Sequence, residues 1–114
     1  MTILYGIKNC DTVKKARAWL DANNIQYQFH DFRADGISSQ KVDAWIDRIG
    51  VETLINKRST TWKELTPAQQ QDLSKTSATQ LILDNPTLIK RPLVEHADDV
   101  FVGFKDADYT SKFK

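Results

Sequence analysis

The first third of the chain alternates between extended and helical patterns, and this order constrains the fold more than any other feature. Residues 2–6 and 25–32 have the pattern of strands, and residues 11–23 between them have the periodicity of an amphipathic helix. Val13 and Leu20 share the apolar face of that helix. A strand–helix–strand unit of this length gives parallel strands with a right-handed crossover. We therefore predict an α/β protein.

Helical patterns occupy the middle of the chain. Residues 39–49 have apolar side chains at i, i+3, i+4 and i+7, which is the spacing of an amphipathic helix. Two capping boxes follow, one starting at Thr66 and one at Ser77. They predict two short helices, at about 67–73 and 78–84.

The end of the chain has the pattern of a β-hairpin followed by a polar tail. Apolar residues within 88–94 and 100–102 predict the hairpin, and residues 105–114 are expected to be helical in part. Together with the first unit, this is the order of a thioredoxin-like α/β fold, with a helical insertion at about 37–85. We predict a single domain over residues 1–114.

Composition excludes several classes of protein. The chain has 114 residues and a net charge of +1, so no large field draws it to nucleic acid or to a membrane. No apolar run approaches the roughly 18–20 residues that span a bilayer. The start of the chain lacks the pattern of a signal peptide. One cysteine and two histidines give neither an internal disulfide nor a metal-ligand pattern. We therefore expect a cytoplasmic monomer with no metal and no bound cofactor.

The single cysteine, Cys10, is a candidate nucleophile. It stands where the first strand ends and the first helix begins. The unpaired N–H groups and the positive dipole end of a helix N-terminus favour a thiolate over a thiol. Lys8 and Lys14 nearby act in the same direction, and Asp11 acts against it. The competing interpretation is that Cys10 is a small hydrophobic residue of the core.

Three segments carry a resemblance to a known family: YGIKNCDTVKKA at residues 5–16, NKRS at 56–59 and LIKRPLV at 88–94. With them the chain resembles the arsenate reductase (ArsC) family, in the branch of YffB and the Spx regulators. The resemblance implies a thioredoxin-like fold with an inserted helical subdomain, in which Cys10 is the redox thiol. It also implies that Arg91 adjoins Cys10, ahead of a cis peptide bond to Pro92.

These observations define a candidate site. We expect Cys10 and Arg91 to be catalytic, the first as the nucleophile and the second as a forked donor to a thiolate or oxyanion. Binding of glutathione or substrate is assigned to Lys8, Asn9, Lys14, Arg58 and Pro92. For Arg58 and Lys14 the alternative is an ordinary solvated surface charge.

The leading hypothesis is a thiol oxidoreductase that depends on external glutathione. The chain has no second cysteine, so a mixed species formed on Cys10 must be released by another thiol, from glutathione or glutaredoxin. Arsenate reduction by the same thiol is one alternative. The glutaredoxin-linked reductases of the family have Gly-Thr-Ser-Arg after the cysteine, whereas this chain has Asp-Thr-Val-Lys at 11–14, which removes anion donors.

The other alternative belongs to a different class, a Spx-like transcriptional regulator that binds the α-subunit of RNA polymerase. Gly50 and Arg58 match positions of the Spx proteins. Gly50 also stands where a helix C-cap needs glycine. The redox-sensing Spx proteins have Cys-x-x-Cys at the first turn, and here Val13 occupies the second cysteine position. A switch based on an internal disulfide is therefore impossible.

Overall fold

The computed structural model describes residues 1–114, which divide into two compact units. The first unit comprises residues 1–35 and 91–114, and the second comprises residues 36–90. The second unit is thus inserted in sequence between the two segments of the first. None of the helices has the length and the apolar run needed to cross a membrane.

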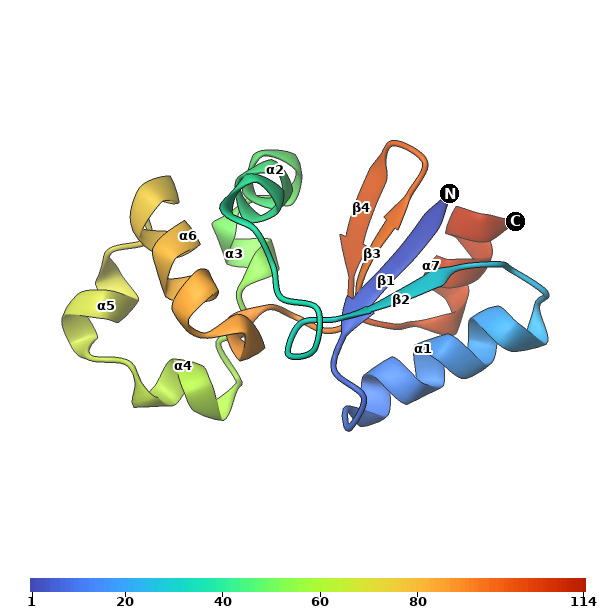
Figure 1. Cartoon of the computed structure of the whole chain (residues 1–114), viewed down its shortest axis with the longest axis horizontal. Helices are drawn as coiled ribbons and strands as arrows, with labels where there is room; N and C mark the ends of the chain where they lie inside the picture. Colours follow the sequence, from blue (N-terminus) through green and yellow to red (C-terminus); the bar gives the residue numbers. More distant parts are fainter. The chain divides into compact units, whose positions relative to one another are not determined.

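The first unit contains a four-stranded mixed sheet in the order β2-β1-β3-β4 (Figure 1). Its strands are β1 (Thr2–Gly6), β2 (Gln28–Asp31), β3 (Leu93–His96) and β4 (Asp99–Val102). The pair β1–β2 is parallel, and the pairs β1–β3 and β3–β4 are antiparallel. The predicted strand–helix–strand unit and the predicted hairpin are therefore both present.

One face of this sheet is covered by α1 (Asp11–Ala22) and α7 (Asp106–Phe113). Leu4 and Val94 are paired across β1 and β3, and both are fully buried against these helices. Leu20 of α1 and Tyr109 of α7 belong to the same cluster. Burial of each large apolar side chain contributes about 1.5–3 kcal/mol. The apolar face predicted for the first helix is therefore the face that fixes α1 on the sheet.

The second unit is helical. Its elements are α2 (Ser39–Ile49), α3 (Val51–Leu54), α4 (Thr60–Glu64), α5 (Pro67–Gln71), α6 (Lys75–Asp84) and a 3-10 turn (Pro86–Leu88). The predicted helix 39–49 is confirmed, and Ser38 caps it by accepting the N–H of Lys41 at 3.2 Å. Val42 and Trp45 of α2 are buried, as is Ile82 of α6. These apolar faces form the core of the unit.

Two local predictions were wrong. The helix predicted at 78–84 begins earlier, at Lys75, and the Ser77 hydroxyl donates to Asp72 Oδ2 at 2.8 Å instead of capping a helix. Residues 51–65, for which no element was predicted, contain α3 and α4. Ile89 is not part of the hairpin, since it forms an isolated bridge with Ile55 inside the helical unit.

Candidate functional site

Cys10 is the N-cap residue of α1, at the end of the short turn that follows β1 (Figure 1). Its backbone is extended, and its C=O accepts the N–H of Lys14 at 3.0 Å, which is the first hydrogen bond of the helix. The sulfur makes no capping hydrogen bond and is partly exposed. The thiol is thus held beside the free N–H groups of the first helical turn without being used to cap them.

A close contact between Gly6 and Val13 sets the distance between the end of β1 and the start of α1. A Cβ atom on Gly6 would lie 2.7 Å from Val13 Cγ2, and real Cβ atoms do not approach so closely. Val13 is fully buried and is stiff because it is β-branched. Glycine at position 6 therefore allows α1 to pack closely enough to hold Cys10 at the end of the sheet.

The peptide bond between Arg91 and Pro92 is cis, as the sequence resemblance implied. Leu93 is paired with Tyr5, so Pro92 lies at the end of the sheet where β1 gives way to the turn of Cys10. The C=O of Pro92 accepts the N–H of Gly103 at 2.8 Å. We call this the Cys10 end of the sheet; Gly6, Asp31, Leu93 and Val102 mark it. Pro92 is buried, whereas Arg91 is half-buried.

The predicted binding residues fall into two groups. Lys8 and Asn9 are exposed in the turn before Cys10, and Lys14 is exposed one helical turn after it. The backbone N–H of Lys14 donates to the Cys10 C=O, so the two residues are one turn apart at the start of α1. Arg58 belongs to the helical unit, where it is exposed in the turn before α4. Its backbone N–H donates to Asn56 Oδ1 at 3.0 Å. Its role at the site stays a prediction.

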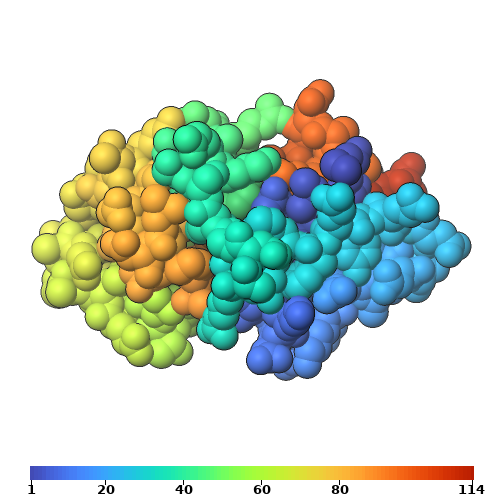
Figure 2. Space-filling view, in the orientation of Figure 1, coloured from blue at the N-terminus to red at the C-terminus, as the bar shows by residue number.

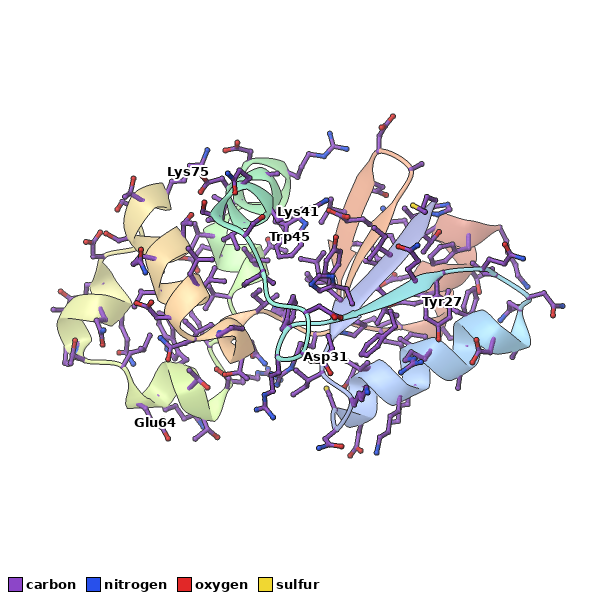
Figure 3. The ribbon with its side chains drawn as sticks, in the orientation of Figure 1. Tyr27, Asp31, Lys41, Trp45, Glu64 and Lys75 are labelled. Atoms are coloured by element: carbon purple, nitrogen blue, oxygen red, sulfur yellow. The ribbon has the colours of Figure 1, made fainter.

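The sequence did not single out the turn after β2, which also lies at the Cys10 end. Asp31, at the end of β2 in Figure 3, is buried and accepts the N–H groups of Arg33 and Ala34 through Oδ1, at 2.8 and 3.2 Å. An aspartate that binds the backbone two residues later is a recognised turn signal. That signal was available in the residues DFRADG.

One ionisable group near this end has a strongly perturbed pKa. Burial, together with a hydrogen bond from Tyr5 Oη to Glu95 Oε1 at 2.8 Å, raises the pKa of Tyr5. The Tyr5 ring also lies 4.8 Å from that of His30, measured between centroids. Tyr5 therefore stays protonated at neutral pH and acts as a fixed donor to Glu95.

A scan against family models matches the ArsC family over residues 5–111. The chain belongs to the ArsC family. The four-stranded sheet with its inserted helices is the thioredoxin-like fold of solved ArsC-family structures. The expected fold and the expected family are thereby both confirmed.

Two solved structures of the ArsC family resemble the chain along almost its whole length. A protein described as YffB is 41% identical, covers all of both chains and superposes with a TM-score of 0.95. An arsenate reductase (ArsC) related protein from Brucella melitensis is 39% identical and has a TM-score of 0.79, over 99% of this chain and 94% of the other.

The curated relatives of the chain include an uncharacterized protein and a transcriptional regulator. An uncharacterized protein of Haemophilus influenzae is 42% identical over 99% of each chain. The global transcriptional regulator Spx of Lactiplantibacillus plantarum is 29% identical over 93% of this chain and 81% of its own length. Family membership therefore leaves both an enzyme and a regulator to be considered.

Proposed function

We propose that the chain is a glutathione-dependent thiol oxidoreductase of the cytoplasm in which Cys10 is the nucleophile. The observation that carries the proposal is the Cys10 thiol at the N-cap of a twelve-residue helix, partly exposed and free of any capping hydrogen bond. Membership in the ArsC family, whose solved members include arsenate reductase-related proteins, supports redox chemistry at this thiol.

The proposed reaction uses one cysteine and one free glutathione for each glutathionylated substrate. The Cys10 thiolate attacks the glutathionyl sulfur of a mixed disulfide between a substrate thiol and glutathione. The S–S bond breaks, the substrate leaves as a thiolate that takes up a proton, and Cys10 becomes glutathionylated. A second glutathione thiolate then attacks the glutathionyl sulfur, which frees Cys10 and produces glutathione disulfide. In the net reaction one free glutathione is oxidised: its sulfur and the glutathionyl group from the substrate form glutathione disulfide, and the substrate thiol is released.

The residues around Cys10 have separate roles in this proposal. N–H groups of the first turn of α1 stabilise the thiolate in both steps, and the exposed ammonium of Lys8 adds positive charge. Arg91 stabilises the negative charge that develops on the sulfurs as bonds exchange. Pro92 and Asn9 shape the surface on which the peptide part of glutathione docks.

The test is the reduction of a glutathionylated peptide, followed through NADPH oxidation by glutathione reductase. Wild-type protein should accelerate the reaction, and Cys10→Ser should return it to the uncatalysed rate, with an unchanged circular dichroism spectrum. Thr12→Ser, a change of similar size in the same helical turn, serves as the control and should keep the activity. Retention of turnover by folded Cys10→Ser protein would overturn the proposal.

Arsenate is a second candidate substrate for the same thiol, favoured by the similarity to the arsenate reductase-related protein of Brucella melitensis. The chain lacks the serine and arginine that follow the cysteine in glutaredoxin-linked reductases, so we expect arsenate turnover to be far slower than disulfide turnover. Replacing the peptide by arsenate in the same assay compares the two. An arsenate rate equal to the disulfide rate would make arsenate the leading substrate.

The similarity to Spx over 93% of the chain favours one further candidate, a regulator that binds RNA polymerase. Immobilised C-terminal domain of the polymerase α-subunit should retain the protein if this function is correct. Gly50→Arg, which places a bulky charge at a position shared with Spx, should then abolish retention. Absence of retention for the wild-type protein would remove this candidate.

A further inference from the structure

The backbone of the turn after β2 is held in place by four hydrogen bonds. Asp31 Oδ1 accepts the N–H groups of Arg33 and Ala34. Two further bonds join Asp31 to Asp35, one from the Asp35 N–H to the Asp31 C=O at 2.8 Å and one from the Asp31 N–H to Asp35 Oδ2 at 3.1 Å. These bonds therefore hold the backbone of Arg33 in place.

This turn leaves the sheet beside the segment that leads to Cys10. Gly6 is paired with Asp31, and the N–H of Phe32 continues the ladder by donating to the C=O of Gly6 at 2.9 Å. Neighbouring strands lie about 4.8 Å apart, so the chain after Gly6 and the chain after Phe32 emerge side by side. In Figure 2 the start of α1, in blue, and the turn after β2, in cyan, both reach the surface.

The guanidinium group of Arg33 is exposed, and no group of the chain pairs with it. The two carboxylates nearest to Arg33 in the sequence, those of Asp31 and Asp35, accept backbone N–H groups instead. Residues 7–15 and 31–35 contain four cations, Lys8, Lys14, Lys15 and Arg33, and three carboxylates, exposed Asp11 and Asp35 and buried Asp31, so the two segments together carry one net positive charge. This excess of positive charge favours an anionic ligand.

We propose that Arg33 binds a carboxylate of an anionic disulfide while the sulfur of that substrate reacts with Cys10. The inference rests on the proposed function, since it assigns a substrate class to the same thiol. The planar fork of an arginine matches the two oxygens of a carboxylate. Glutathione disulfide belongs to this class, because it carries carboxylates on both sides of its S–S bond. Arg33 thus selects anionic over neutral disulfides.

The experiment compares two disulfide probes at low ionic strength. The Cys10 thiolate attacks one sulfur of glutathione disulfide, the S–S bond breaks, a glutathione thiolate leaves, and Cys10 becomes glutathionylated. Bis(2-hydroxyethyl) disulfide undergoes the same exchange without carrying charge. Mass spectrometry of the quenched protein gives the second-order rate constant for each probe. The selectivity is the ratio of the two rate constants.

Arg33→Gln should lower this selectivity roughly three- to tenfold, with the rate for the neutral probe unchanged, because only one charge-assisted contact is lost. Arg48→Gln, the same change at an exposed arginine of α2, should leave the selectivity unaltered. Equal selectivity in wild-type and Arg33→Gln protein, or an equal loss in Arg48→Gln, would overturn the inference and leave the proposed function intact. Failure of wild-type Cys10 to react with either probe would instead overturn the proposed function.

Discussion

At the scale of single residues, Gly6 shows how a missing side chain positions the proposed nucleophile. We expect Gly6→Ala to lower the free energy of unfolding by about 1–2 kcal/mol. Overpacking against buried Val13 costs about 1–3 kcal/mol, and the reduced freedom of the unfolded chain returns about 0.4–1 kcal/mol. Urea denaturation measures the change.

A double-mutant cycle with Val13→Ala is the control for this prediction. Shortening Val13 removes the atom that the new methyl group would meet, so the two substitutions should couple favourably by at least about 0.5 kcal/mol. Strictly additive effects would show that the contact between Gly6 and Val13 does not set the approach of α1 to β1.

At the scale of elements, α2 and α6 are joined by a hydrogen bond from Thr79 Oγ1 to Asp43 Oδ1 at 2.6 Å. Thr79 is buried, so Thr79→Val keeps the shape of the side chain and leaves the Asp43 carboxylate without this donor. We expect a loss of about 1–3 kcal/mol in the free energy of unfolding. Thr76→Val, at an exposed position of the same helix, should change it by less than about 0.5 kcal/mol. Similar losses in both variants would mean that valine destabilises α6 through its low helix propensity and that the hydrogen bond between Thr79 and Asp43 contributes little.

Helix starts also show what a local pattern predicts. The capping box at Thr66 is present. Thr66 Oγ1 accepts the backbone N–H of Gln69 at 3.2 Å, and Gln69 Oε1 accepts the backbone N–H of Thr66 at 2.9 Å. The box proposed at Ser77 failed, because Asp72 accepts the Ser77 hydroxyl and the helix has already begun. Both segments carry the same signal. The carboxylate that competes for Ser77 lies outside the four residues of that box.

At the scale of the whole molecule, alkaline pH should destabilise the fold. Burial raises the pKa of Tyr109, so above its ordinary value near 10 the unfolded chain loses a proton that the folded chain keeps. The contribution of Tyr109 to the free energy of unfolding is therefore fully present below pH 10 and is lost as the pH rises further. Tyr5 contributes in the same direction.

Tyr109→Phe isolates one of these two contributions. The substitution removes the hydrogen bond from Tyr109 Oη to the C=O of Gly103, so the variant should be less stable than wild type at pH 7. The difference should narrow by about 1 kcal/mol at pH 11, because the variant has no phenol to ionise at this position. Urea denaturation at both pH values measures it. A difference that is equal at pH 7 and pH 11 would show that Tyr109 does not titrate on unfolding.

The sequence by itself determined the elements with strong periodicity and the family. The apolar face of 11–23, the helix at 39–49 and the three segments around Cys10, Arg58 and Arg91 were sufficient, because each signal lies within a few neighbouring residues. For the site, local pattern placed Cys10 at a helix start and put proline ahead of β3.

Only the tertiary structure decided which distant segments meet. The pairing of Gly6 with Asp31 brings the turn of Arg33 to the Cys10 end of the sheet, and the bridge between Ile55 and Ile89 removes residues 88–90 from the hairpin. These outcomes depend on hydrogen bonds between residues 25 or more positions apart. No local periodicity encodes such pairs, because they form only when both partners are brought together by burial of a common core.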